Sequence, residues 1–491
     1  MRPTVISMRR LGVVVAWASL LVASGCVPHH SVATPAPAPE RIVARPRPVV
    51  ALPPDIPWHL HKTRGAGISG YANTTSIAPG DPVSLYVSTS AATFRVAVFR
   101  MGWYDGAEGR LVTRTQATVG VLQPAAVIEA PTNTVTAPWF PSLTLHTGTW
   151  APGDYLLRLD ASDGSQSYVP LTVRGPTARG RVVLVSPVTT WQAYNRWGCC
   201  NLYAGGNGTF ATRSRAVSFD RPYEAEHGAG EFLDRELPVL SEAERLHLRL
   251  DYVTSIDLEQ DPQLLDGATA VISMGHDEYW SPAMRTAVTT ARDAGTNLAF
   301  LGANAMFRRI RFDATAAGPD RLEIDYKVAA EDPLRYTDPS AVTSDWPDWP
   351  DPEPESNVIG ASYNCFNRVR TDGVVADPKS PLFRGTGVVA GTHLPGLIGP
   401  ETDRFLGGPD QPGAVDVLMH SPFPCPPSGL SIDADTTYYT ASSGAGVFDS
   451  GTLSWVCALG QTCATPQTSA VVQRVTDNLL RLFAYGPAST S

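Results

Sequence analysis

The sequence has few charged residues and no apolar run long enough to cross a membrane as a helix. Of its 491 residues, 17% are charged, below the quarter that is typical of soluble domains, while Gly (42) and Pro (43) are abundant. The net charge of −9 provides no basic surface, so nucleic-acid binding is excluded from the expected functions. A chain of this length exceeds one ordinary core, and we therefore predict at least two domains, rich in strands and loops.

The first 26 residues have the pattern of a bacterial export signal. Arg9 and Arg10 precede an apolar run over residues 11–22, which is shorter than the roughly 20 residues of a membrane-spanning helix. Small residues then lead to Cys26, as in a lipoprotein cleavage site. We predict that Cys26 is lipidated and anchors the chain on the outer side of the bacterial cell membrane. A plain secretory signal, and hence a secreted protein, is the alternative.

Cysteine is also scarce, and six residues remain after Cys26. An even number of cysteines in an exported chain predicts disulfides, and C-x₂-C spacing, which would favour a metal site, is absent. Cys457 and Cys463 are close enough to form a small loop. The other pairings cannot be chosen from the sequence. The remaining four are Cys199, Cys200, Cys365 and Cys425.

The rest of the chain divides into three parts by its composition and by the spacing of its apolar runs. Residues 27–57 form a proline-rich linker, which is expected to be extended. Residues 58–176 contain short alternating apolar runs separated by turn signals, which predicts an immunoglobulin-like β domain. Residues 180–486 alternate strands with helices and predict a flavodoxin-like parallel α/β sheet, with a long loop-rich insertion at 302–465.

Motifs of the common hydrolases are missing from the sequence. It has no G-x-S-x-G, H-E-x-x-H or EF-hand pattern, which disfavours a serine hydrolase, a zinc protease and a calcium-loop protein. Asn304 follows the predicted strand 297–301, at a place where such a sheet often carries a nucleophile. Asparagine cannot attack a carbonyl, although it can hold a substrate or water by hydrogen bonds.

Polar side chains follow the apolar run 270–274, which is typical of a buried parallel strand. In open α/β sheets, ligands bind at the carboxyl ends of the strands. If the backbone stays extended there, His276 and Glu278 point the same way, while Asp277 and Tyr279 face away and pack. A structural role for His276 is the competing interpretation, because histidines at strand ends are often hydrogen-bonded parts of the scaffold.

Tyrosines lie near the same predicted edge of the sheet. Tyr194 follows the strand 182–185, and Tyr223 lies in the loop beyond it. Each tyrosine taken alone is more typical of a core or turn position.

Taken together, several blocks of the sequence resemble the large (β) subunit of N,N-dimethylformamidase and its relatives. The resemblance extends over roughly residues 60–486. It implies an α/β domain similar to class I glutamine amidotransferases that lacks their cysteine nucleophile. The blocks are residues 68–71, 99–104, 190–195, 218–223, 275–281, 300–304, 391–404 and 451–459.

The resemblance also implies a mononuclear ferric site that hydrolyses an amide. Its expected ligands are Tyr194, Tyr223 and Glu278, with Tyr203 as a rival tyrosine because the loop lengths here differ. Cys199 and Cys200 stand where relatives usually carry small residues, and a disulfide there would reshape the loop between the candidate tyrosines. The residues that match supporting or proton-transferring positions are His276, Asn304, Glu401 and, more loosely, Lys327.

The leading hypothesis is therefore an exported, iron-dependent hydrolase of amide C–N bonds that acts on a small amide. A rival hypothesis is a non-catalytic cell-surface protein that binds carbohydrate or envelope components through a degenerate site. A third is a metal-free hydrolase that uses His276 and Glu278 as acid and base. The sequence determines neither the substrate nor the oligomeric state.

Overall fold

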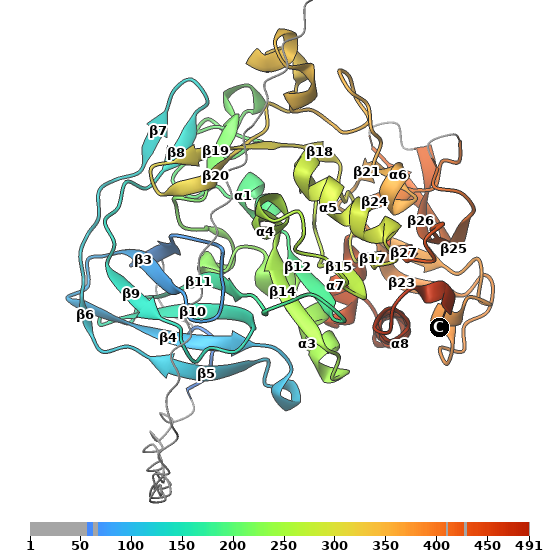
Figure 1. Ribbon diagram of the computed structural model, residues 1–491, viewed down its shortest axis with the longest axis horizontal. Coiled ribbons are helices and arrows are strands. Elements are labelled where there is room, and N and C mark those ends of the chain that lie inside the picture. Colours follow the sequence, from blue (N-terminus) through green and yellow to red (C-terminus); the bar gives the residue numbers. More distant parts are fainter. Residues whose placement is uncertain (1–55, 62–66, 409–410, 427–429, 491) are drawn as a thin grey trace, which may run out of the picture. The chain divides into compact units, whose positions relative to one another are not determined.

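A computed structural model describes residues 56–61, 67–408, 411–426 and 430–490 of the chain (Figure 1). These residues belong to one compact unit. The predicted export signal, Cys26 and nearly all of the proline-rich linker lie outside the described residues. Within the described ranges, no helix combines the length and the apolar character needed to cross a membrane.

The first part of the described chain forms two main β-sheets. One has the strand order β1-β3-β9, and the other has the order β2-β11-β10-β4-β5, with β6 paired to β4. Alternate side chains of β4, among them Phe94, Val96 and Val98, are buried in a shared apolar core, as expected for strands with one face inward. The strands are β1 Ile68–Ala72, β2 Ser76–Ile77, β3 Pro82–Thr89, β4 Thr93–Met101, β5 Gly109–Arg114, β6 Thr118–Val119, β7 Val127–Glu129, β8 Thr134–Thr136, β9 Leu143–His146, β10 Gly153–Ala161 and β11 Gln166–Val173.

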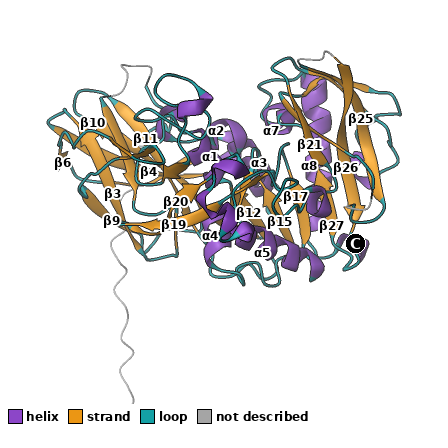
Figure 2. Cartoon of the chain, turned by 90° about the horizontal axis from the view of Figure 1, so that it is seen from above, coloured by secondary structure: helices purple, strands orange, loops and turns teal. Residues whose placement is uncertain are grey.

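The second part is built on a seven-stranded sheet of order β14-β12-β15-β17-β27-β26-β25. The pairs from β14 to β27 are parallel, and the last two pairs are antiparallel. Figure 2 shows helices packed beside these strands. The strands of the sheet are β12 Val182–Ser186, β14 Leu250–Thr254, β15 Ala270–Ser273, β17 Asn297–Phe300, β25 Val415–Cys425, β26 Leu430–Thr440 and β27 Gly446–Asp449.

Helices cover both faces of the sheet. Leu184 packs in the same core as α3 and α8, whereas Val183 and Val185 pack with α5. Both faces of the strand are therefore apolar, which explains its continuous run of valine and leucine. The helices are α1 Val188–Tyr194, α2 Phe232–Arg235, α3 Leu237–Arg245, α4 Ser255–Gln260, α5 Pro282–Asp293, α6 Ser356–Ile359, α7 Ser454–Leu459 and α8 Pro466–Phe483.

The expectation of a loop-rich insertion over 302–465 is wrong in one respect, because β25, β26 and β27 of this segment complete the main sheet. Two features hid them in the sequence. Strand β25 contains Pro422 and Pro424, which argue against a strand, and β27 has four residues, too few for a clear pattern. The smaller strands of the second part are β13 Ala216–Ser218, β16 Tyr279–Trp280, β18 Arg308–Arg309, β19 Arg311–Thr315, β20 Gly318–Ile324, β21 Ser362–Phe366, β22 Thr371–Val374, β23 His393–Ile398 and β24 Glu401–Arg404.

All six cysteines of the described chain form disulfides, which confirms the prediction. Cys457 pairs with Cys463, Cys365 with Cys425, and Cys199 with its neighbour Cys200. The second bond ties β21 to the edge strand β25. The third lies in the loop that follows α1.

The two parts of the chain share one apolar core and several polar contacts. Phe99 and Leu156 of the first part pack in the same core as Leu184 and Leu240 of the second. Arg100 donates a hydrogen bond of 2.6 Å to Glu244 on α3.

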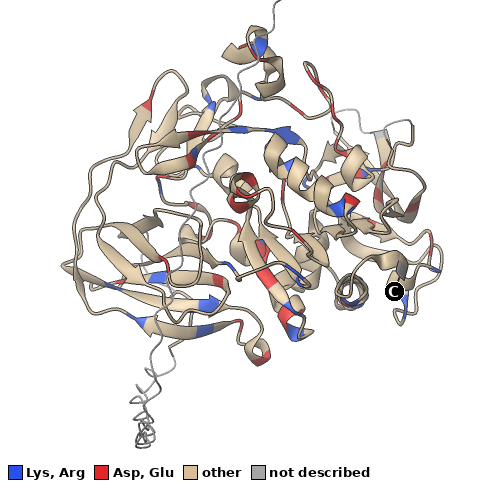
Figure 3. Ribbon diagram, in the orientation of Figure 1, with Lys and Arg blue, Asp and Glu red and all other residues tan. Residues whose placement is uncertain are grey.

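Acidic and basic residues are interspersed over the described ribbon (Figure 3).

Candidate functional site

The candidate site lies where three parallel strands end. Strand β12 leads into α1, whose last residue is Tyr194, and β15 leads into the segment that carries His276 and Glu278. Strand β17 leads to Asn304. These strands pair side by side in parallel, so their carboxyl ends bring the three segments to one edge of the sheet.

Glu278 is held by its main chain from two sides. Gly275 adopts a positive φ of 70°, and a Cβ atom there would lie 2.4 Å from the carbonyl oxygen of Arg235. The chain therefore turns sharply after β15. The main-chain N–H of Glu278 donates to Thr190 Oγ1 at 2.9 Å, and its carbonyl accepts from the N–H of Arg308 at 2.8 Å. These contacts fix where the carboxylate points.

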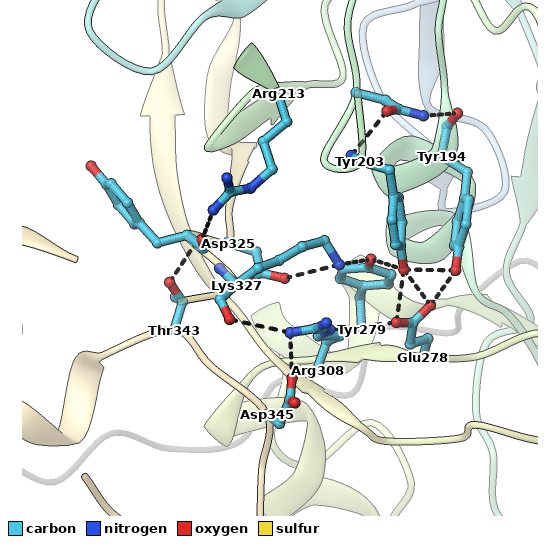
Figure 4. A network of polar contacts seen from close by, with 12 residues as sticks. Tyr194, Tyr203, Arg213, Glu278, Tyr279, Arg308, Asp325, Lys327, Thr343 and Asp345 are labelled. Carbon is cyan, nitrogen blue, oxygen red and sulfur yellow. Dashed lines mark hydrogen bonds and ion pairs between the residues drawn. The ribbon is translucent and has the colours of Figure 1, made fainter. Parts of the chain in front are cut away.

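Three oxygen-bearing side chains converge at this point (Figure 4). The Tyr194 hydroxyl donates to Glu278 Oε2 at 2.6 Å, and the Tyr203 hydroxyl lies 2.9 Å and 3.1 Å from the two oxygens of the same carboxylate. The two hydroxyls are 2.7 Å apart, and the two rings stack with centroids 4.6 Å apart. Two phenols and one carboxylate thus share a single small volume.

The structure places Tyr203, and not Tyr223, beside Tyr194 and Glu278. The loop after α1 folds back on the helix, because Asn201 donates to the carbonyl of Tyr194 at 2.8 Å and accepts from the N–H of Tyr203 at 2.9 Å. Tyr223 packs instead against Trp191, with ring centroids 5.7 Å apart, and lines a separate cavity. Tyr223 is therefore separated from the two other expected ligands, and the rival residue Tyr203 occupies the position beside them.

Tyr279 also belongs to this network, contrary to the expectation that it faces away. Its hydroxyl donates to the Tyr203 hydroxyl at 2.7 Å and accepts from Lys327 Nζ at 2.5 Å. Residues 276–278 follow the turn at Gly275 and belong to no strand, so strand alternation does not determine the side on which Tyr279 lies. Asp277, by contrast, is buried and accepts from Ser273 Oγ at 2.7 Å, as a packing residue would.

His276 lies among three carboxylates. Its Nε2 atom is 3.2 Å from Glu401 Oε2 and 3.5 Å from Glu278 Oε2, and its Nδ1 atom is 3.7 Å from Glu231 Oε2. The side chain of Asn304 donates to Glu401 at 3.3 Å. The predicted residues His276, Asn304 and Glu401 are therefore neighbours of one another and of Glu278.

Nearby cations determine the charge of Glu278. Burial alone would raise its pKa, but the contact with His276 and the positive charges of Lys327 and Arg308 outweigh burial and lower the pKa to about 2. Arg308 Nε lies 3.6 Å from Glu278 Oε1. The carboxylate is therefore ionised at neutral pH, although only 2% of its side chain is exposed.

The surrounding groups respond to that negative charge. Burial is the largest cause that raises the pKa of Tyr194 and Tyr203 well above 10, and the charge of Glu278 adds to it. Burial disfavours the charged form of His276, but Glu401, Glu231 and Glu278 raise its pKa well above 6.5. Burial lowers the pKa of Lys327 to about 8. The site thus holds an ionised carboxylate, protonated phenols and cationic neighbours.

Sequence reasoning missed three residues of this site. Arg308 reaches Glu278 because β18 pairs with β16. These strands have two residues each, too few to show a periodic pattern of apolar residues in the sequence. Glu231 lies before α2, in a segment without a recognisable motif. Tyr279 lies within the block 275–281, but strand alternation wrongly placed it on the opposite side from Glu278.

The donor set fits a hard, highly charged cation. Within the described ranges, no three residues of the His, Cys, Asp and Glu types are grouped to hold a metal ion. A metal at this site would therefore need the tyrosine oxygens as well as Glu278. Phenolate and carboxylate oxygens are hard donors, and a nearby cation favours loss of the phenol proton, so the residues suit a ferric ion.

Comparison with known proteins gives one extensive match. The family model described as "N,N-dimethylformamidase beta subunit-like, C-terminal" matches residues 95–467. No curated protein matches the chain. The match to the family model therefore covers most of the sequence.

Two solved structures are similar over short segments. A cycloisomaltooligosaccharide glucanotransferase from Paenibacillus sp., complexed with cycloisomaltoheptaose, has 16% identity and a TM-score of 0.15; the match covers 24% of this chain and 15% of that one. Murine CEACAM1b has 13% identity and a TM-score of 0.13, with 22% of this chain and 52% of that one covered. The match to the family model spans more than half of the sequence, and the chain belongs to the N,N-dimethylformamidase beta subunit-like family.

Proposed function

We propose that this protein is an exported, iron-dependent hydrolase of amide C–N bonds. The observation that carries the proposal is the convergence of Tyr194, Tyr203 and Glu278, whose oxygens lie 2.6–3.1 Å from one another. Membership of the dimethylformamidase beta subunit-like family supports the same reaction class.

Tyr194, Tyr203 and Glu278 would hold the ferric ion. Such an ion, when bound, polarises an amide carbonyl and makes a bound water more acidic. Glu278 is prepared for this role because His276, Lys327 and Arg308 keep it ionised. The two phenols keep their protons in the absence of a cation, so binding of the metal is expected to release protons.

The residues beside the ligand set handle the substrate and its proton. His276 lies between Glu278 and Glu401, within 3.5 Å of both, which allows it to carry a proton between the site and a departing amine. The amide group of Asn304 is held by Glu401 and can hydrogen-bond an amide substrate. Lys327 acts on Tyr203 through Tyr279 and serves as a positioning residue.

The finer fold assignment and the location are parts of the same proposal. We infer that the sheets of residues 68–173 form an immunoglobulin-like sandwich and that the sheet begun by β12 belongs to the glutamine-amidotransferase-like class. The five parallel neighbours from β14 to β27 support the second inference. Lipidation of Cys26 would hold the chain on the outer side of the cell membrane.

Metal analysis combined with an amide-hydrolysis assay tests the proposal. The purified chain is expected to contain about one iron per molecule and to release amine from small formamides or acetamides. Glu278→Ala is expected to lose both properties, whereas Glu353→Gln, at an exposed glutamate, retains them. Activity without metal, unaltered in Glu278→Ala, would contradict the proposal. Glycan binding that survives Glu278→Ala and Tyr194→Phe, without hydrolysis, would favour the surface-binding alternative.

A further inference from the structure

A second group of buried acidic side chains lies beside a cavity between the first and second parts of the chain. Asp154 on β10 and Thr172 on β11 line the cavity from one side, and Ser186 on β12 and Trp191 on α1 line it from the other. Its volume is about 40 Å³. Because a single water needs roughly 10–15 Å³ by the same measure, a molecule of about three heavy atoms fits.

Polar atoms at this cavity lack partners within the described chain. Asp154 is 4% exposed, and its Oδ1 atom accepts from Thr172 at 2.7 Å while its Oδ2 atom has no hydrogen-bond partner there. Glu236 is fully buried, and neither of its carboxylate oxygens has a hydrogen-bond partner there by distance and angle. The same is true of the Nε1 atom of Trp191. Buried polar groups are nearly always hydrogen-bonded in folded proteins, so either a ligand or ordered water is expected at this cluster.

Asp154 is close enough to Glu236 to affect its pKa. Burial raises the pKa of Glu236 well above 4.5, the charge of Asp154 raises it further, and the nearby Ser186 and Trp191 side chains lower it. Burial likewise raises the pKa of Asp154 to about 6. The hydrogen bond from Thr172 and the charge of Arg100 lower the pKa of Asp154 but do not outweigh burial. The two acidic groups are therefore compensated only in part.

The arginines of the cavity wall do not supply that compensation. Arg221 donates to the main-chain carbonyls of Asn195 and Cys200. Arg321 donates to Asp220 and to the carbonyl of Phe219. Neither guanidinium makes a hydrogen bond or ion pair with Asp154 or Glu236 in the part of the chain that is described.

Six of the residues that line the cavity are aromatic, and they favour one chemical class of ligand. A metal ion such as Ca²⁺ needs six to eight oxygen ligands, which rings do not provide. Aromatic faces attract organic cations, and a buried carboxylate pairs with their N–H groups. The aromatic lining residues are Tyr71, Tyr155, Trp191, Phe219, Tyr223 and Phe232.

We propose that this cavity binds a small alkylammonium cation of the size of methylammonium or dimethylammonium. The N–H groups of the cation donate to Asp154, and its alkyl groups pack against the aromatic lining residues. Glu236, which lies next to the lining residues Ser186 and Trp191, adds negative charge beside the cavity. Thr74 and Thr75 line both this cavity and a second, neighbouring pocket. The inference does not depend on amide hydrolysis at Glu278.

Isothermal titration calorimetry on the full chain tests this proposal with methylammonium and dimethylammonium chloride as probes. For a ligand of three heavy atoms, the upper limit of affinity per atom corresponds to a Kd of about 1 mM. We expect saturable binding of one equivalent, no binding of methanol, and no response to Na⁺ or Ca²⁺ beyond that of matched ionic strength. This series needs no variant and therefore remains decisive if a substitution prevents folding.

Two isosteric variants locate the site. Asp154→Asn and Glu236→Gln are each expected to weaken methylammonium binding at least 10-fold, whereas Asp234→Asn, at an exposed aspartate near Glu236, leaves it unchanged. Absence of binding at 100 mM probe, equal binding of Na⁺, or binding that survives both variants would overturn the proposal. Because none of these readouts uses hydrolysis or iron, a failure here is distinguishable from a failure of the proposed function.

Discussion

Helix α1 contributes side chains to two groups of buried carboxylates, and the two groups differ in how their charge is compensated. At one, Tyr194 lies beside Glu278, whose negative charge is balanced by Lys327 and Arg308. At the other, Trp191 lies beside the cavity of Asp154, where the acidic groups have few partners. The pKa of Glu278 is accordingly lowered to about 2, while that of Asp154 is raised to about 6.

The difference shows that burial alone does not determine the state of an acidic side chain. Both carboxylates are almost fully buried, and desolvation raises the pKa of each. Neighbouring cations reverse the result for Glu278 and not for Asp154. A carboxylate that is already ionised can hold a metal without first losing a proton. A carboxylate with a raised pKa is stabilised in its ionised form most strongly by a cation that also donates hydrogen bonds to it.

The largest expected effect follows from neutralising Glu278. Glu278→Gln keeps the shape of the side chain but removes the charge that His276, Lys327 and Arg308 surround. We expect iron content to fall below 10% of wild type and amide hydrolysis to fall at least about 10³-fold, as for loss of a group that stabilises transition-state charge. Elemental analysis and amine release measure the two quantities. Retention of iron together with full activity would contradict the assignment.

Replacing the rival tyrosines by phenylalanine, one at a time, is expected to give the next largest effect on iron binding. Tyr203→Phe removes an oxygen that contacts both Tyr194 and Glu278, so iron affinity is expected to fall by at least 10–100-fold, the range known for residues that merely support a metal ligand. Tyr223→Phe, on the far side of Trp191, is expected to change it less than twofold. Competition with a chelator measures both affinities, with the exposed Tyr336→Phe as control. The reverse order would return Tyr223 to the ligand set.

The pH dependence of stability should have opposite signs in the two groups. Because the pKa of Asp154 rises from 3.8 to about 6 on folding, the folded chain binds more protons and its stability falls as pH rises from about 4 to 6. The loss is up to about 3 kcal/mol, at 1.4 kcal/mol for each pH unit of the shift. Glu278, with its lowered pKa, instead loses its stabilising contribution as pH falls from about 4.5 toward 2.

Asp154→Asn tests this contrast directly. The variant is expected to unfold in urea with less dependence on pH between 4 and 6 than wild type, and to be more stable at pH 7. Glu278→Gln is expected to keep the slope in that range. A wild-type stability that does not fall between pH 4 and 6 would show that Asp154 is compensated after all.

Removing the single hydrogen bond to Asp154 should have the smallest effect. Thr172 Oγ1 donates to Asp154 Oδ1 at 2.7 Å and holds the pKa of the carboxyl down against burial. Thr172→Val is expected to raise that pKa by less than about one unit, equivalent to about 1 kcal/mol. The same urea series detects the change as a decline in stability that extends to higher pH. No change would mean that the hydroxyl does not stabilise the ionised form.

Much of the second part of the chain could be predicted because its signals are local. The apolar runs of β12 and β15 need no long-range information. The start of α5 is also local, because Ser281 Oγ accepts from the N–H of Met284 at 3.1 Å. Because parallel strands end at one edge of a sheet, these runs also located Tyr194, His276, Glu278 and Asn304. The block 275–281 therefore indicated the edge of the sheet at which these side chains lie together.

The remaining features depend on contacts between distant segments. The choice of Tyr203 over Tyr223 follows from Asn201, which folds the loop back onto α1. Arg308 reaches Glu278 through a two-residue strand pair, and Glu401 enters from a strand more than 100 residues away along the chain. Such placements are set by tertiary packing, and local composition does not reveal them.

Anomalous X-ray diffraction from crystals soaked with ferric ion, recorded at the iron edge, tests the central claim most directly. We predict one strong anomalous peak at about 2 Å from the hydroxyl oxygens of Tyr194 and Tyr203 and from the carboxylate of Glu278, the separation of directly bonded oxygen ligands. A peak at Tyr223 or on the protein surface, or the absence of a peak at these three residues, would contradict it.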